Sequence, residues 1–286
     1  MPDGILIMDK PQGWTSMDVC AKLRGILREK RVGHAGTLDP MATGVLPVFI
    51  GRATKAVQFA ENGRKEYHAV LKLGTVTDTQ DVTGAVLETR PAAVSREELS
   101  AVLPRFTGEL LQLPPMYSAL KVNGQRLYDL ARRGETVERR PRQITIDALE
   151  LLGQTAPDTF ALRVVCSKGT YVRTLCHDIG QALGCGGCMA ALRRTMAAGF
   201  LLSEAVTLEQ VQEKGEALLL PLEAYFRDRP RFTVQNDAQE KRAYNGNSFY
   251  AQGLADGEYR LYDRKDAFLA LVRAENGEVH AIKNFF

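Results

Sequence analysis

The sequence lacks long apolar runs and contains few cysteines. Five cysteines among 286 residues is an odd number, which favours free thiols in a reducing compartment over a disulfide framework. No apolar run approaches the roughly 20 residues that cross a bilayer. Residues 1–10 contain no basic segment followed by a long apolar one, so no signal peptide is expected. These absences predict a cytoplasmic protein with no membrane contact.

An excess of charge of one sign is missing as well. The net charge is +3, from 37 Lys and Arg against 34 Asp and Glu, so bulk charge does not identify a polyanionic partner. Basic residues nevertheless gather in two places, which slightly favours a phosphate backbone over solvated helix faces. The two clusters are Lys22, Arg24, Arg28, Lys30 and Arg31, and Arg132, Arg133, Arg139, Arg140 and Arg142.

Several well-defined catalytic and cofactor motifs are also absent. The sequence contains no P-loop, no dinucleotide fingerprint and no paired zinc signature, and it has no serine-centred elbow of a hydrolase triad. Cys185-Gly-Gly-Cys188 is a single CxxC, whereas a structural zinc requires four ligands. We interpret these cysteines as small buried residues, and we expect neither a metal nor a cofactor.

The residues that are present suit a globular protein with a full core. Hydrophobic residues make up 45% of the chain and charged residues 25%, which excludes disorder. Alternating or apolar runs predict strands, and apolar positions at helical spacing predict helices. Together they predict an α+β fold in which helices flank a mixed or antiparallel sheet. The expected strands are 4–8, 45–50, 66–73, 85–88, 144–152 and 160–166, and the expected helices are 16–27, 54–60, 95–103, 127–133, 170–183 and 208–214.

Two details of the later chain complete this prediction. Thr170 is expected to cap the helix at 170–183, and Leu192-Arg-Arg-Thr195 is expected to lead into a strand near Phe200. The segment 113–142 is irregular and holds the second basic cluster. An excursion of this length inside a compact domain is more often functional than idle.

The last part of the chain has a different pattern. Short alternating runs at 259–262, 268–272 and 279–282 are broken by Asp256-Gly257 and Asn276-Gly277, and both dipeptides are hairpin signals. A small β-rich module is therefore expected after a boundary at 221–230.

The loop at residues 31–44 is the first candidate site. Pro40 fixes its own φ and disfavours the α region at Asp39, so the acid should be held in a set orientation. Three glycines relieve the Cβ restriction on φ: Gly33, Gly36 and Gly44. Since the same residue types also make ordinary turns, the loop by itself fits a turn and a site equally well.

Other residues supply possible partners for Asp39. An arginine facing an aspartate holds it ionised and aimed, and Arg173 begins a predicted helix. Tyr67 could offer a flat surface for a nucleobase, although it could equally be a core residue. His34 could be a general base, and Asp78 and Asp81 could be paired acids, although residues of that kind in a turn-rich loop more often cap backbone amides.

Taken together, five spaced motifs resemble the bacterial tRNA pseudouridine-55 synthases, the TruB family. The likeness runs from the N-terminus to about residue 225, and the tail resembles the small PUA-type RNA-binding module of that family. The motifs are Asp9-Lys10-Pro11-x-Gly13-x-Thr15-Ser16, Gly33-His34-x-Gly36-Thr37-Leu38-Asp39-Pro40-x-Ala42-Thr43-Gly44, Lys65-x-Tyr67, Ser167-Lys168-Gly169-Thr170-Tyr171-Val172-Arg173 and Leu192-Arg193-Arg194-Thr195.

The resemblance implies that the uridine at position 55, in the T-loop of tRNA, is isomerised to pseudouridine. It implies that Asp39 is the catalytic aspartate, whether the carboxylate adds to the sugar, adds to the uracil or removes a ribose proton. Arg173 would pair with Asp39, and Tyr67 would stack on the uracil and handle a proton. Leu192 would contact the base and Tyr171 would line the pocket.

Further roles follow from the same resemblance. His34 would fill the gap left by the flipped uridine, and Lys10 with Pro11 would support the loop from behind. The predicted domains are a catalytic domain at 1–226, with an RNA-clamping insertion at 113–142, and a PUA-like domain at 230–286. The expected partner is the T-arm of tRNA, bound by a monomer with no obligate protein partner.

Two rival interpretations belong to other classes. A non-catalytic protein that binds or folds tRNA would use the basic clusters and the tail equally well, but it would not need Asp39 or Arg173. A hydrolase with an aspartate nucleophile would need a second acid or a metal to activate water, and neither is clearly placed in the sequence.

Overall fold

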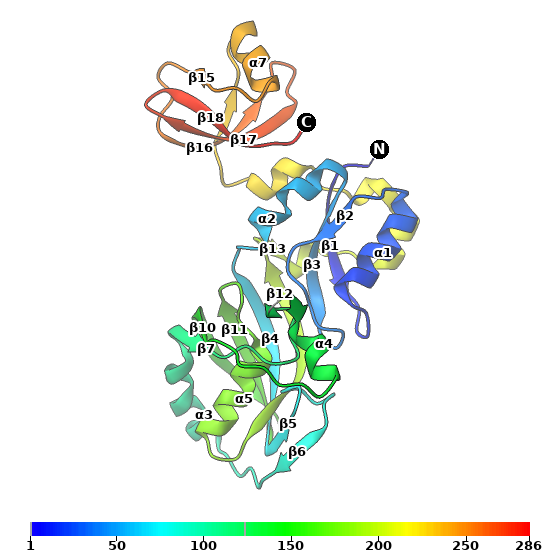
Figure 1. Ribbon diagram of the computed structural model, residues 1–286, viewed down its shortest axis with the longest axis vertical. Helices are drawn as coiled ribbons and strands as arrows, with labels where there is room; N and C mark the ends of the chain where they lie inside the picture. Colours follow the sequence, from blue (N-terminus) through cyan, green and yellow to red (C-terminus); the bar gives the residue numbers. More distant parts are fainter. Residues whose placement is uncertain (1, 123) are drawn as a thin grey trace.

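The computed structural model describes residues 2–122 and 124–286, and it contains two main sheets (Figure 1). Met1 and Asn123 lie outside the described residues. The larger sheet has nine strands in the order β1-β3-β12-β4-β11-β10-β7, with β2 paired to β3 and β13 to β12. Its strands are β1 (Gly4–Lys10), β2 (Val32–His34), β3 (Thr43–Ile50), β4 (Lys65–Leu73), β7 (Gly108–Gln112), β10 (Arg142–Ala156), β11 (Thr159–Cys166), β12 (Gly187–Ala197) and β13 (Phe200–Leu201).

Most neighbouring strands in this sheet are antiparallel, and one pair is parallel. That pair joins β12 to β3 through Arg193 opposite Thr43 and Arg194 opposite Gly44. Two small hairpins, β5 (Thr75–Thr77) with β6 (Val86–Thr89) and β8 (Lys121–Val122) with β9 (Gln125–Arg126), lie outside the sheet. The prediction of an α+β fold on a mixed sheet is confirmed.

The helices form where the sequence supplies caps and an apolar face. Thr15, Ser95 and Thr207 each accept a hydrogen bond from the backbone N–H three residues on, and each forms a capping box. The described α-helices and 3-10 helices are α1 (Ser16–Leu27), η1 (Gly51–Ala56), α2 (Val57–Ala60), α3 (Arg96–Val102), η2 (Leu103–Phe106), α4 (Leu127–Arg132), α5 (Val172–Ala182), η3 (Leu202–Glu204), α6 (Leu208–Lys214), η4 (Gly215–Leu218), η5 (Leu222–Phe226) and α7 (Asp237–Tyr244).

Helices α1 and α5 bury their apolar faces against different strands of the sheet, and each helix belongs to a separate core cluster. Helix α1 packs Val19 and Leu23 against β1 and β3, whereas α5 packs Leu175 and Ile179 against β4 and β11. The alternation predicted for β4 is confirmed, because Tyr67, Ala69, Leu71 and Leu73 are buried and His68 is exposed. The face of β4 that carries Tyr67 therefore belongs to the core shared with α5.

One local prediction for this part of the chain was wrong. Thr170 does not cap α5: the N-cap residue is Tyr171, which has no side-chain cap, and the Thr170 hydroxyl is buried without a partner. The strand predicted near Phe200 is present as β13. The run Leu192–Thr195 before it lies within β12, a strand that was not predicted.

The C-terminal sheet is a separate five-stranded unit, seen at the top of Figure 1. Its order is β14-β16-β17-β18-β15, from β14 (Arg231–Thr233), β15 (Phe249–Tyr250), β16 (Gly257–Tyr262), β17 (Phe268–Glu275) and β18 (Glu278–Asn284). Asn276 and Gly277 have positive φ and close the β17–β18 hairpin as predicted. Asp256-Gly257 closes no hairpin, because Gly257 begins β16 and the β16–β17 turn lies at 263–267. The helix α7 was not predicted.

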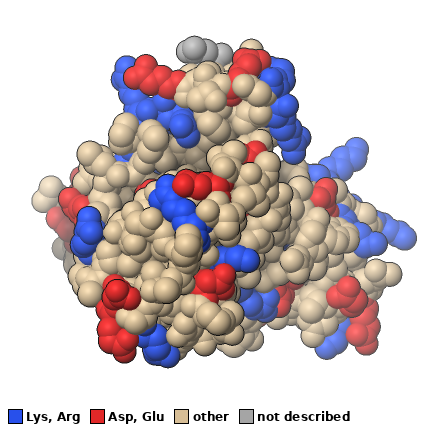
Figure 2. All heavy atoms as spheres, turned by 90° about the horizontal axis from the view of Figure 1, so that it is seen from below, with Lys and Arg blue, Asp and Glu red and all other residues tan. Residues whose placement is uncertain are grey.

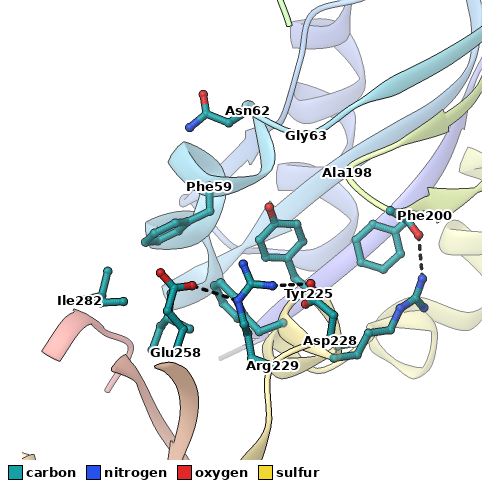
Figure 3. A pocket seen from close by; sticks show the side chains of 15 residues that line it. Phe59, Asn62, Gly63, Ala198, Phe200, Tyr225, Asp228, Arg229, Glu258 and Ile282 are labelled. Carbon is teal, nitrogen blue, oxygen red and sulfur yellow. Dashed lines mark hydrogen bonds and ion pairs between the residues drawn. The ribbon is translucent and has the colours of Figure 1, made fainter. Parts of the chain in front are cut away.

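An aromatic cluster joins the C-terminal sheet to the larger one. Phe226 packs against Phe59 and also against Phe268 and Phe285. A cavity of about 500 Å³ opens beside this contact, crossed by the ion pair between Arg229 and Glu258 at 3.0 Å (Figure 3). None of the predicted site residues lines this cavity.

Substitutions at two glycines test how closely β3 approaches β12 at the end of the loop at 31–44. A Cβ on Gly44, at φ +100°, would overlap the backbone of Arg194, whereas a Cβ on Gly13, at φ +83°, would meet nothing within 4 Å. Gly13→Ala should therefore lose only the roughly 1 kcal/mol that a positive φ costs a non-glycine residue. Gly44→Ala should lose much more, because the β3–β12 pairing must open.

Denaturant unfolding of both variants measures the difference. Equal losses of unfolding free energy in Gly13→Ala and Gly44→Ala would contradict the close approach of β3 to β12.

Candidate active site

Asp39 lies in the segment between β2 and β3, and hydrogen bonds of the backbone hold this segment on both sides. The N–H of Leu38 donates to the Ser16 hydroxyl at 2.9 Å, and the N–H of Gly13 donates to the Pro40 carbonyl at 2.8 Å. Ala42 donates to the Asp39 carbonyl at 3.0 Å. The loop is therefore fixed against the N-terminus of α1 and against the turn that follows β1.

Of the three glycines in this segment, two have the backbone conformation that the sequence suggested. Gly36 and Gly44 have φ of +85° and +100°, whereas Gly33 lies in β2 without a positive φ. The left-handed backbone at two positions explains why the chain needs glycine there.

Arg173 lies beside Asp39 and pairs with its carboxylate. The distance from Arg173 Nε to Asp39 Oδ2 is 3.0 Å, and the side chains are 7% and 39% exposed. Arg173 stands in the first turn of α5, and its remaining donors reach the carbonyls of Thr79 at 2.9 Å and Tyr117 at 2.8 Å. One guanidinium therefore joins the Asp39 loop, the loop after β5 and the insertion.

The groups around Asp39 shift the pKa of its carboxyl in opposing directions. Partial loss of water around the carboxyl raises the pKa of Asp39, the Arg173 guanidinium opposes this, and the carboxylate of Asp81 adds to the rise. The net effect is a raised pKa. Asp39 consequently takes up a proton at a higher pH than an exposed aspartate does.

Asp81 is a site residue that the sequence interpretation did not select. It is 4% exposed, and its Oδ2 lies 3.5 Å from Arg173 Nη1. Its Oδ1 accepts from the Thr83 N–H at 2.9 Å and from the Thr79 hydroxyl at 2.9 Å, so the predicted capping of local groups is present too. The acidic, threonine-rich run at 77–83 was a signal, but nothing in it pointed to Arg173.

Tyr67 and Leu192 come together on neighbouring strands. Each is 8% exposed, and both belong to the core cluster that also contains Leu38 and Ala42 of the Asp39 loop. Burial raises the pKa of the Tyr67 phenol. The two residues therefore lie in the same apolar core as part of the loop that carries the acid.

Tyr171 and Lys10 hold other parts of the site. Tyr171 is half-buried, its N–H donates to Gln112 Oε1 at 2.8 Å, and burial raises the pKa of its phenol. The fully buried Lys10 donates to the carbonyls of Trp14 at 2.5 Å and Pro40 at 3.3 Å. Burial lowers the pKa of Lys10 to about 8, and the charge of Asp39 opposes that change. Lys10 thus lies behind the loop.

His34 does not join the acid in the described part of the chain. It lies in β2, paired with Val48 of β3, and its Nδ1 is buried without a partner. Burial lowers the pKa of the imidazole, and the charge of Arg194 adds to this effect. A neutral histidine with no contact to Asp39 is poorly placed as a base acting through that carboxylate.

The described residues offer no alternative metal-based site. They contain no group of three or more His, Cys, Asp or Glu side chains that could hold an ion. Cys185 and Cys188 are buried free thiols, as interpreted from the sequence.

No helix in the described ranges is long and apolar enough to span a membrane. Lysine and arginine are interspersed with acidic side chains over the lower end of the molecule (Figure 2).

Comparison with known proteins identifies the family. Residues 24–172 match the model of the TruB family pseudouridylate synthase N-terminal domain, and residues 173–227 match that of the tRNA pseudouridylate synthase B C-terminal domain. The chain is 48% identical to tRNA pseudouridine synthase B of Pseudomonas fluorescens over 96% of this chain and 93% of the relative. It is 39% identical to the Clostridium kluyveri protein of the same name, over 99% of both chains.

Solved structures agree with this result. A chain of a Cbf5-Nop10-Gar1 complex superposes with a TM-score of 0.74 and 27% identity, covering 99% of this chain and 85% of that chain. The superposition includes the C-terminal sheet, and it is consistent with a PUA-like module there. The fold, the order of the motifs and the matched models lead to one conclusion: the chain belongs to the TruB family and is a tRNA pseudouridine synthase, an isomerase.

Proposed function

We propose that this enzyme converts the uridine at position 55, in the T-loop of tRNA, to pseudouridine, and that Asp39 is the group that acts on the nucleotide. The observation that carries the proposal is the ion pair of Asp39 with Arg173 at 3.0 Å, beside the apolar surface of Tyr67 and Leu192. An ionised acid next to a flat base-binding surface suits a reaction at a nucleoside.

The isomerisation requires no atom from outside the nucleotide except exchangeable protons. The C1′–N1 bond breaks, the uracil rotates, the C1′–C5 bond forms, C5 loses its hydrogen as a proton and N1 gains one. Asp39 can serve this sequence by adding to the sugar, by adding to the uracil or by removing a ribose proton. In each case Arg173 keeps the carboxylate ionised and aimed.

The target uridine must leave its stack to reach the site, because the Asp39 carboxylate is partly buried and held by Arg173. Extruding a base costs a few kcal/mol, which contacts in the pocket and a side chain in the vacated stack offset. We assign the pocket contacts to Tyr67, Leu192 and Tyr171, and the vacated stack to His34, whose neutral imidazole suits insertion between bases. Lys10 supports the loop through its carbonyl contacts.

RNA binding is assigned to two further parts of the chain. Tyr117 of the insertion at 113–142 accepts a hydrogen bond from Arg173 through its carbonyl, which supports a role of this segment beside the site, and the arginines of the insertion would contact the T-arm backbone. Residues 1–226 would form the catalytic domain and 230–286 the RNA-binding module. A related solved structure is an H/ACA particle bound to a substrate RNA containing 2′-deoxyuridine. We propose that this protein works as a cytoplasmic monomer without a protein partner, metal or cofactor.

A tRNA-folding role that does not depend on catalysis is the second candidate function, favoured by the basic residues of the insertion. Asp39→Asn separates the two because it removes the charge and leaves the shape of the side chain. The variant should bind a T-arm RNA normally and release no tritium from 5-tritiated uridine, since only bond formation at C5 expels that hydrogen. Filter binding and tritium release measure the two properties.

A matched control makes the same chemical change at a surface aspartate. Asp18 lies in the exposed capping box of α1, where its carboxylate accepts from the Thr15 N–H at 2.8 Å. An asparagine oxygen can accept the same hydrogen bond, so Asp18→Asn should keep full turnover. Substantial turnover by Asp39→Asn would remove Asp39 from its proposed role.

The charges around Asp39 predict the acid side of the pH profile. The reaction needs the ionised carboxylate, so the raised pKa of Asp39 should place the fall in rate at a higher pH than for an ordinary aspartate of about 3.9. Asp81→Asn removes a negative charge that adds to the rise. In this variant the rate should therefore decline at a lower pH than in wild type, as measured by single-turnover tritium release. A decline at a higher pH than in wild type would contradict this electrostatic account.

A further inference from the structure

Arg194 is the largest side chain that the described fold buries completely. It is 1% exposed, and no salt bridge among the described residues includes it. Burying a cation without a counter-ion is costly unless hydrogen bonds compensate it. The function proposed above gives Arg194 no role, although it lies next to two residues of the site.

The register of the sheet places Arg194 between Gly44, at the end of the Asp39 loop, and Tyr67. On one side its strand β12 pairs with β3, where Arg194 is opposite Gly44 at the end of the Asp39 loop. On the other side β12 pairs with β4, where Arg194 is opposite Tyr67. The three residues therefore form one row across the sheet.

The guanidinium of Arg194 holds both ends of the Asp39 loop. Its Nε donates to the Val45 carbonyl at 2.6 Å, and its Nη2 donates to the Gly36 carbonyl at 3.0 Å. Asp39 lies between these two anchors in the sequence. A Cβ at Gly36 would come within 3.4 Å of Arg194 Nη1, so the loop lies directly against the guanidinium.

The same guanidinium acts on the Tyr67 phenol. Burial raises the pKa of the Tyr67 phenol, and the charge of Arg194, which lies opposite Tyr67 across the β4–β12 pair, opposes that rise. Arg194 thus interacts with the residue assigned to stack on the uracil as well as with the loop that carries the acid.

We propose that Arg194 is a positioning residue of the active site, which fixes the Asp39 loop and the Tyr67 ring relative to each other across the target uracil. This inference rests on the proposed function of Asp39 and Tyr67. Among the described residues the hydrogen bonds of Arg194 reach carbonyls at the ends of the loop and not the Asp39 carboxylate, so its effect is exerted through the loop that it holds and the tyrosine beside it. Small misplacements of reacting groups have large effects on rate.

The chain provides a matched control in the preceding residue. Arg193 has the same side chain on the same strand, but it is 40% exposed and pairs with Asp9 at 2.7 Å. Lysine retains the charge at either position and loses the planar, multiply donating group. Arg194→Lys and Arg193→Lys therefore make the same chemical change, but only at position 194 does it break the contacts with the Gly36 and Val45 carbonyls.

The test compares single-turnover tritium release, T-arm RNA affinity and thermal unfolding for both variants. Arg194→Lys should lose about 100-fold in rate while its Kd stays within about threefold of wild type, because positioning affects the chemical step. Arg193→Lys should keep the wild-type rate. A near wild-type rate in Arg194→Lys, or a rate loss matched by an equal loss of RNA affinity, would overturn the proposal.

Two further observations keep the result interpretable. If Arg194→Lys does not fold, Gly36→Ala retains the guanidinium and strains the backbone at φ +85°, which disturbs the carbonyl that accepts from Arg194 Nη2. That variant should lose rate and keep RNA affinity, and an unchanged rate would overturn the proposal. Wild-type protein that released no tritium would instead refute the proposed function, independently of Arg194.

Discussion

The ion pair between Asp39 and Arg173 is the interaction on which the candidate site depends. Taking a carboxylate and a guanidinium partly out of water costs free energy, and the pair is retained only where further hydrogen bonds satisfy the buried donors. Arg173 meets this condition through the carbonyls of Thr79 and Tyr117. The contact that aims the acid therefore also ties together the loop after β5, the insertion and α5.

The side of the loop away from Arg173 is held by a different kind of contact. There the cations Lys10 and Arg194 donate to backbone carbonyls rather than to acids. Carbonyl dipoles stabilise a buried cation without neutralising its charge. The positive charges of Lys10 and Arg194 therefore still act on neighbouring groups in the site. Lys10 and Arg173 lower the pKa of Asp39, whereas burial and Asp81 raise it. Several groups, rather than a single partner, therefore determine the pKa of Asp39.

The sequence predicted those features that depend on local pattern. The alternation in β4, the helices α1, α3 and α6 and the Asn276-Gly277 hairpin follow from propensities and short-range hydrogen bonds, and the structure has all of them. The omissions arose where pairing with distant strands decides the outcome. Strand β12, which includes the run Leu192–Thr195, was not predicted because it forms between β3 and β4, and no local pattern records that pairing.

The site was predicted less completely than the fold, for the same reason. Asp39 and Arg173 were identified from their motifs, and the structure brings them together. Asp81 was judged to be a residue that caps local backbone amides, and it does so. Its contact with Arg173 was not predicted, because the two residues are 92 positions apart in the sequence. Arg194 was noted only as part of a motif. A buried arginine cannot be distinguished from an exposed one by sequence alone, as its neighbour Arg193 shows.

The most direct test of the central claim is to map pseudouridine in transcribed, unmodified tRNA after incubation with the purified protein and no additives. The account predicts one modified position, the uridine at position 55 in the T-loop, with wild-type protein and none with Asp39→Asn. Pseudouridine at another position, or equal modification by Asp39→Asn, would contradict it.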